Sequence, residues 1–113
     1  MIYTQKEIYD YLSNNPLGVT VSIGDVENLN SADYIFLDYT SDEIIGSDNE
    51  GTYQTFIQVT VATRDFDDRA TLVKYVKDYF KVMSIDYEKS FEFEYFLARM
   101  NKGILMKGEP VSV

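Results

Sequence analysis

The stretch Thr52–Thr63, TYQTFIQVTVAT, decides the fold class of this chain. Aromatic and β-branched residues dominate it, and apolar and polar residues alternate along most of its length, which is typical of a half-buried β-strand. The predicted apolar face carries Tyr53, Ile57, Val59 and Val61, and the predicted polar face carries Gln54, Gln58 and Thr60. The β-forming run 33–40, DYIFLDYT, precedes it and predicts an antiparallel partner strand.

The residues that follow this strand predict an amphipathic helix. They read TRDFDDRATLVKYVKDYFKVM over positions 63–83, and either Asp65 or Asp67 suits the N-cap. Acidic side chains in a first turn also interact favourably with the helix dipole. The apolar positions fall on one helical stripe: Leu72, Val73, Val76, Phe80 and Met83.

The flanking segments predict one more helix and three more strands. At the N-terminus, Thr4 and Glu7 have the spacing of a capping box, and the predicted helix ends near Ser13, before Pro16. Alternation at 19–23 predicts a short strand closed by Gly24, and 25–32 forms a polar connector. The last two predicted strands are SFEFEYFLARM at 90–100 and GILMKG at 103–108.

Together these segments predict a single α+β domain over residues 1–113. A chain of 113 residues with 45% hydrophobic content is long enough to bury a core without disulfides or a structural metal. We expect a small, mostly antiparallel sheet of about five strands packed by two helices, in the order α-β-β-β-α-β-β. A long hairpin loop is predicted at about 40–52, because a tight hairpin needs far fewer residues.

The composition excludes several kinds of chemistry. The chain has no cysteine and no histidine, which removes disulfides, thiolate nucleophiles, imidazole bases and the common zinc sites. No run approaches the roughly 18 apolar residues of a membrane span, so no membrane partner is expected. A formal net charge of −9 argues against tight binding to nucleic acid. We expect no enzyme activity, no cofactor and no metal.

Three clusters of acidic residues could have either a metal-binding or catalytic role or a purely structural one. The segment 47–51, SDNEG, brings oxygen ligands together but lacks the alternate spacing of a calcium loop, so a solvated loop is favoured. Helix capping accounts for Asp65, Asp67 and Asp68 better than acid–base or two-metal chemistry does. Glu92 and Glu94 share one face of a predicted strand, which we interpret as a solvent-facing or subunit-facing surface.

The arrangement resembles a known family, the tail terminator or tail completion proteins of long-tailed bacteriophages. The resemblance covers residues 8–96 and lies in the short length, the N-terminal helix, the YIFLDY strand, the polar loop and the run TFIQVTVATRDFDDRATLVKYVKDYF. It implies a non-enzymatic virion protein, assembled in the host cytoplasm, that forms a ring of six copies at the head–tail interface. The implied partners are the tail tube protein and the head connector, with DNA passing through the ring without tight binding.

The polar loop is then predicted to be the assembly contact. We expect 39–54 to be a hairpin arm that orders on a neighbouring subunit or on the tail tube, and we assign the contact to Asp42, Glu43, Ile44, Ile45, Asp48 and Glu50. Two alternatives are another connector component, such as a stopper, and a small acidic inhibitor that mimics DNA. Ten interspersed lysines and arginines argue against the DNA mimic.

Overall fold

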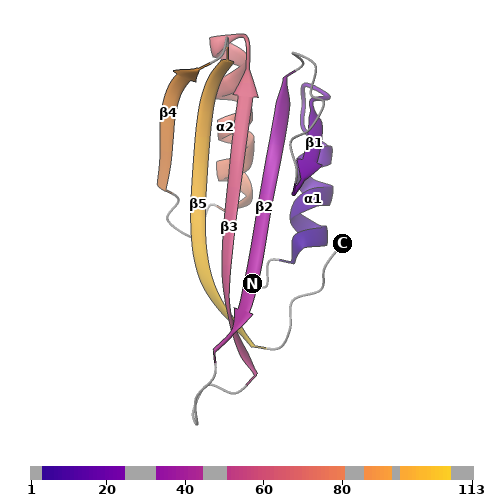
Figure 1. Cartoon of the computed structure of the whole chain (residues 1–113). Coiled ribbons are helices and arrows are strands. Elements are labelled where there is room, and N and C mark those ends of the chain that lie inside the picture. Colours follow the sequence, from indigo (N-terminus) through magenta and orange to yellow (C-terminus); the bar gives the residue numbers. More distant parts are fainter. Residues whose placement is uncertain (1–3, 25–32, 45–50, 81–85, 93–94, 108–113) are drawn as a thin grey trace.

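A computed structural model describes residues 4–24, 33–44, 51–80, 86–92 and 95–107 of the chain (Figure 1). Along the chain the elements are α1 (Gln5–Ser13), β1 (Thr20–Ile23), β2 (Tyr34–Glu43), β3 (Thr52–Thr63), α2 (Phe66–Tyr79), β4 (Asp86–Glu92) and β5 (Tyr95–Lys107). The predicted α+β class, with two helices and a mostly antiparallel sheet, is confirmed.

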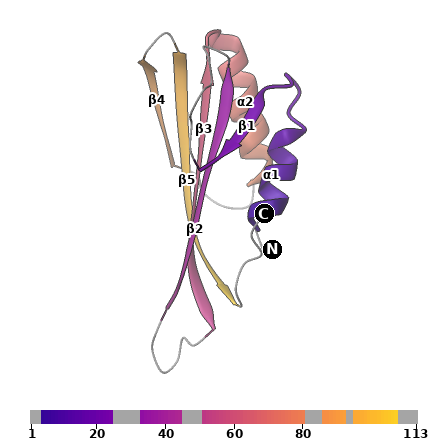
Figure 2. The same ribbon diagram turned by 45° about the vertical axis from the view of Figure 1, so that its right-hand side comes forward.

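The strands form one mixed sheet, and both helices lie on the same side of it. The spatial order is β1-β2-β3-β5-β4; β1 pairs with β2 in parallel, and the other neighbours are antiparallel. Helix α1 packs against β1 and β2, and α2 packs against β3 and β5. Figures 1 and 2 show the opposite side of the sheet without a helix.

The core lies between the helices and the covered side of the sheet. Alternate residues of the central strands meet there in rows, such as Leu37 beside Val59 and Val59 beside Met100. Each of these three side chains is at most 2% exposed. The helices close the core with buried apolar residues: Ile8 and Leu12 from α1, and Leu72, Val73 and Val76 from α2. The stripe predicted for the second helix is buried as expected at Leu72, Val73, Val76 and Phe80, and Met83 lies outside the described residues.

Both helices begin at the caps that the sequence predicts. The Thr4 hydroxyl accepts a hydrogen bond from the Glu7 backbone N–H at 3.2 Å. Asp65, rather than Asp67, caps α2: its Oδ1 accepts from the N–H groups of Asp67 at 2.8 Å and Asp68 at 3.1 Å. Each cap satisfies backbone donors that the first turn of a helix leaves unpaired.

The hairpin between β2 and β3 has more strand and less loop than expected. The ladder continues through Asp42, which pairs with Gln54, to Glu43, and the Ile44 N–H then donates to the Thr52 carbonyl at 2.8 Å. The predicted loop at 40–52 is wrong in its extent. Ladder hydrogen bonds use the backbone alone, so polar side chains can occupy strand positions as long as they remain hydrated or paired. Residues 45–50 lie outside the described part of the chain.

The C-terminal strands also divide differently from the prediction. A single strand over 90–100 is wrong, because β4 ends at Glu92 and β5 begins at Tyr95, and these two residues pair. The separate strand predicted at 103–108 is the second half of β5, which continues to Lys107. Apolar and polar residues continue to alternate through the point where the chain reverses direction, so periodicity alone does not reveal the reversal.

Two tyrosines bind the helices to each other. The Tyr11 hydroxyl donates to the Tyr75 carbonyl at 2.6 Å, and the Tyr75 hydroxyl donates to the Tyr11 carbonyl at 2.7 Å. Their rings stack with centroids 4.3 Å apart, and the Tyr79 ring lies 4.5 Å from that of Tyr11. We call Tyr11, Tyr75 and Tyr79 the tyrosine clasp. It fixes α1 against α2 on one side of the sheet.

The clasp predicts a loss of stability at alkaline pH. Burial, and then the nearby Tyr75, Asp78 and Tyr79, raise the pKa of Tyr11 from 10.0 to about 12. Above pH 10 the unfolded chain releases this proton more readily than the folded chain, so stability present below pH 10 is lost as the pH approaches 12. Urea unfolding across this range should show a steeper loss for the wild type than for Tyr11→Phe. Parallel curves for the two proteins would contradict the assignment to Tyr11.

Candidate functional site

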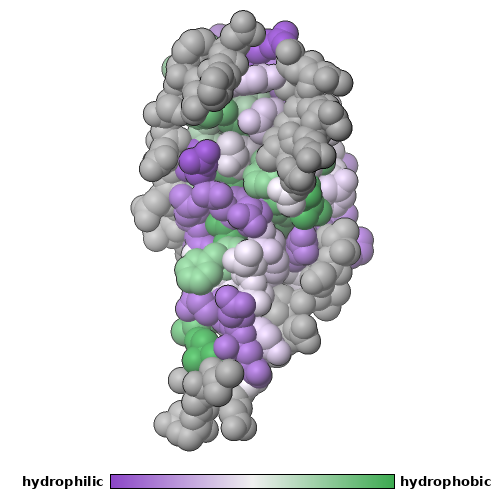
Figure 3. All heavy atoms as spheres, in the orientation of Figure 1, coloured by the Kyte–Doolittle hydropathy of each residue, from purple (hydrophilic) through white to green (hydrophobic). Residues whose placement is uncertain are grey.

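The side of the sheet without helices is the principal candidate surface. By register it carries alternate residues of the three central strands, and we call it the open face: Tyr34, Phe36, Asp38, Thr40 and Asp42 of β2, Gln54, Phe56, Gln58, Thr60 and Ala62 of β3, and Tyr95, Leu97, Arg99, Asn101, Gly103 and Leu105 of β5. Figure 3 shows hydrophilic side chains gathered over its centre with separate hydrophobic patches among them. The face is thus neither a solvated polar surface nor an apolar core.

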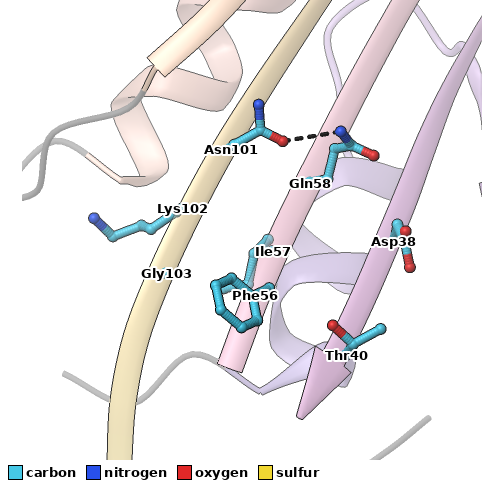
Figure 4. Close-up of a pocket in the computed structure, with 8 residues that line it drawn as sticks. All are labelled: Asp38, Thr40, Phe56, Ile57, Gln58, Asn101, Lys102 and Gly103. Carbon is cyan, nitrogen blue, oxygen red and sulfur yellow. Dashed lines mark hydrogen bonds between the residues drawn. The ribbon is translucent and has the colours of Figure 1, made fainter. Parts of the chain in front are cut away.

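A depression of about 410 Å³ crosses the middle of the open face. Asp38 and Thr40 border it on β2, Phe56 and Gln58 on β3, and Asn101 on β5 (Figure 4). The Gln58 amide donates to the Asn101 Oδ1 at 2.9 Å, so these two amides engage each other across the strands. The depression combines one carboxylate, one hydroxyl, an amide pair and an aromatic ring, which suits contact with a protein surface better than proton transfer.

Phe56 is the most unusual residue of this depression. It is 55% exposed although it lies in the middle strand of the sheet. Gly103 pairs with it on β5, and a Cβ at Gly103 would lie 3.5 Å from the ring atoms Cδ1 and Cε1. The absence of a side chain at Gly103 leaves one edge of the ring uncovered. An exposed aromatic ring on a central strand can contact a partner at little cost in conformational entropy.

A second, smaller depression of about 170 Å³ lies further along the open face. Tyr34, Phe36 and Arg99 line it with Gln58 and Thr60. The rings of Tyr34 and Tyr95 meet edge-on across β3, with centroids 5.7 Å apart. Tyrosine and arginine are enriched in the cores of protein–protein interfaces, and their presence here extends the candidate surface along the strands.

One end of the sheet projects well past both helices. Figures 1 and 2 show β2, β3 and β5 continuing beyond the end of α1, and the molecule measures 49 × 28 × 24 Å. We call this three-stranded extension the arm: residues 40–44, 51–56 and 103–107. Its open face presents two exposed apolar side chains, Phe56 and Leu105, the latter 64% exposed.

No model of a known protein family and no curated protein sequence matches this chain. Among these residues, no group of three or more acidic, histidine or cysteine side chains is placed to hold a metal ion. None of the helices in the described ranges is long and apolar enough to cross a membrane.

The covered side of the sheet carries a buried cation behind the depression. Lys102 is 9% exposed and lies in one row with Ile57 and Tyr39. Burial lowers the pKa of Lys102. Burial also raises the pKa of Tyr39, and a hydrogen bond with Thr55 offsets part of that effect. In Figure 4 the Lys102 side chain extends away from the depression, so it does not contribute an ammonium group to the open face.

The predicted assembly residues fall at the end of the arm. Asp42 and Glu43 are exposed and close β2, and Ile44 is half-buried beyond them. Asp42 and Glu43 are neighbours in a strand, so their side chains project to opposite faces of the arm. The remaining predicted contacts, Ile45, Asp48 and Glu50, lie outside the described residues.

The other acidic candidates have structural positions. Asp65 is the cap of α2, and desolvation, followed by the negative charges of Asp65, Asp33 and Asp67, raises the pKa of Asp68. The capping role is confirmed for Asp65, and Asp67 and Asp68 lie in the first turn of α2. Glu92 is the last residue of β4, whereas Glu94 lies outside the described residues. Of the segment 47–51 the structure describes Gly51, whose φ of +78° is a backbone conformation that favours glycine.

Sequence reasoning did not single out Phe56, Gly103 or Leu105. One signal was present: Phe56 falls between Gln54 and Gln58 on the predicted polar face of Thr52–Thr63. A large aromatic residue on the polar face of an alternating strand indicates a surface position that contacts more than solvent. No comparable signal distinguished Gly103, because only the pairing of β3 with β5 places it beside Phe56.

Proposed function

We propose that this chain is a non-enzymatic virion structural protein that assembles into a ring, caps a bacteriophage tail tube, ends tail growth and offers a surface for head attachment. The observation that carries the proposal is the arm, with Phe56 and Leu105 exposed on its open face. The resemblance of residues 8–96 to tail terminator proteins supplies the biological setting.

The open face has the character of an interface between subunits. It combines exposed aromatic and aliphatic side chains with amides and isolated charges, and both described helices lie on the other side of the sheet (Figures 1 and 2). Exposed apolar groups of this kind on a soluble domain mark contact surfaces. A contact between two different surfaces of identical subunits closes into a ring when the rotation between them permits.

The charge of the chain fits a ring through which DNA passes. With a net charge of −9, carboxylates facing a central bore would repel phosphates and keep the bore from holding the genome. A ring of six copies, the tail tube protein below it and the head connector above it complete the proposal. Another head-to-tail connector component, such as a stopper, is the alternative within the same assembly.

Interrupting the gene in the parent phage tests the function directly. Electron microscopy of the lysates should show filled heads beside separate tails of uncontrolled length. Separate tails of normal length would move the chain to the stopper position. Intact infectious particles would overturn the proposal.

The two apolar residues of the arm give a matched prediction. Phe56→Asp combined with Leu105→Asp should abolish self-association while leaving the circular dichroism spectrum unchanged, because both side chains are exposed on the open face. Sedimentation velocity should report a monomer for this variant and a concentration-dependent oligomer for the wild type. Loss of large apolar anchors commonly costs 2 kcal/mol or more of binding energy, roughly a 30-fold change in affinity.

The control for this prediction is Leu17→Asp. Leu17 is 41% exposed but lies in the turn after α1, away from the open face. It replaces an exposed leucine and adds one negative charge, as each arm substitution does. It should leave self-association unchanged. Equal loss of association in the control and in the arm variant would show that added negative charge, rather than the arm surface, decides the result.

A further inference from the structure

A groove on the flank of α2 has a lining unlike that of the rest of this acidic protein. It encloses about 360 Å³, with Phe66, Ala70 and Val73 as apolar walls; its charged lining residues are the basic Arg69, Lys74 and Lys77 and one carboxylate, Asp78. Phe66 is 55% exposed although its ring meets that of Phe96 edge-on at 5.7 Å. Three of the ten basic residues of the chain thus lie around one groove.

Arg69 is the unusual member of this lining. Its side chain is 6% exposed, and its guanidinium carbon lies 4.6 Å from the ring centroid of Phe66 and 5.7 Å from that of Phe96. Among the described residues its guanidinium forms no ion pair with a carboxylate. A buried charge without an anion is costly, and contacts with aromatic rings offset only part of that cost. A carboxylate that enters the groove beside Arg69 would offset the remaining cost.

The apolar walls and the size of the groove identify the kind of anion. A volume of about 360 Å³ accommodates several side chains, and the walls require an apolar group next to the charge. The end of the arm offers such a combination: Asp42 carries an exposed carboxylate, and by strand alternation the apolar Ile44 follows on the same side, whereas the exposed Glu43 projects to the opposite side. Guanidinium groups bind carboxylates through paired, charge-assisted hydrogen bonds.

We propose that the α2 groove binds the acidic end of the arm, 42–44, of a second copy of this chain. Figures 1 and 2 show the arm running away from α2 and past both helices, so the arm of the same copy does not reach the groove. Each copy then offers one arm and one groove, which is the head-to-tail contact that propagates around a ring. This inference depends on the self-assembly part of the proposed function.

Charge reversal on each side of the contact gives a complementation test. In the groove variant, Ala70→Glu and Lys74→Glu replace two exposed residues of α2; in the arm variant, Asp42→Lys and Glu43→Lys replace two exposed residues of β2. Each variant alone should sediment as a monomer, with at least a 30-fold loss of self-affinity. An equimolar mixture should recover oligomers, because the reversed groove accepts the reversed arm and the unchanged groove accepts the unchanged arm.

The matched control places the same charge change on the other helix. Gln5→Glu with Lys6→Glu alters the formal charge by −3, as the groove variant does, and should associate like the wild type. A mixture of groove and arm variants that stays monomeric, while the wild type and the control associate, would overturn the contact and leave the proposed ring intact. A wild type that stays monomeric at every concentration would overturn the contact, and tail length in the disrupted phage would then decide the function separately.

Inorganic phosphate distinguishes a peptide-binding groove from a general anion site. Isothermal titration of the arm variant with phosphate should show no saturable binding at millimolar concentrations, because the groove requires an apolar group beside the charge. Saturable phosphate binding that disappears in the groove variant would overturn the assignment to the arm and identify a phosphate site.

Discussion

Tyr11→Ala should lower the free energy of unfolding by about 3 kcal/mol. The substitution removes the ring that stacks on Tyr75 at 4.3 Å and touches Tyr79 at 4.5 Å. It also removes the hydroxyl that donates to the Tyr75 carbonyl. Urea unfolding at neutral pH, monitored by circular dichroism, measures the change.

Tyr11→Phe separates the two contributions to the clasp. It keeps the stacked ring and deletes the hydrogen bond, so it should cost about 1 kcal/mol. The difference between the alanine and phenylalanine variants then reports ring packing between α1 and α2. If Tyr11→Ala costs less than Tyr11→Phe, the helices are not held by this clasp, and another contact must fix α1 on the covered side of the sheet.

Asn15→Ala should lower the free energy of unfolding by about 2 to 3 kcal/mol. Asn15 is 7% exposed in the turn between α1 and β1, and its amide group forms four hydrogen bonds with the backbone. The Nδ2 group donates to the carbonyls of Leu12 and Val19, each at 2.9 Å. The Oδ1 atom accepts from the N–H groups of Leu17 at 3.2 Å and Val19 at 2.9 Å.

The neighbouring Asn14→Ala is the control for this turn. Asn14 is exposed, and its side chain donates to the Asp10 carbonyl at 2.9 Å, so water can replace what the substitution removes. It should cost no more than about 0.5 kcal/mol. Equal costs at positions 14 and 15 would show that the buried amide does not organise the turn. Chemical denaturation of both variants in parallel makes the comparison direct.

These two features account for the position of both described helices on the same side of the sheet. The tyrosine clasp ties α1 to α2, and the Asn15 turn delivers the chain from α1 into β1 at the edge of the sheet. Both helices are consequently held on the same side. Within the described residues, no helix covers the open face or the arm, which is the condition that the proposed assembly requires.

The sequence predicted the elements that depend on local patterns. The alternation of Thr52–Thr63 and the stripe that includes Leu72 and Val76 identified the central strand and the second helix, and both are buried as expected. The caps at Thr4 and Asp65 were also recognisable, because a cap involves residues two or three positions apart. Such features are encoded within a few residues of chain and need no knowledge of distant neighbours.

The reversal between Glu92 and Tyr95 and the length of the β2–β3 ladder were not predictable in this way. Apolar and polar residues keep alternating through the reversal. The end of the β2–β3 ladder consists of polar residues, which are typical of a loop. In both cases the backbone hydrogen bonds of a partner strand decide the outcome. The periodicity and composition of a segment indicate which of its side chains prefer burial. Which strands pair, and over what length, depends on the whole sheet.

The functional candidates show the same division. The sequence by itself determined that the chain is an acidic α+β domain without thiol or imidazole chemistry, and it pointed to Asp42 and Glu43 as contact residues. Only the tertiary structure decided that Phe56 lies exposed beside Gly103 and that Arg69 is buried against the rings of Phe66 and Phe96. The physical reason is that exposure and charge compensation depend on side chains brought together from segments far apart in the chain, which no local pattern records.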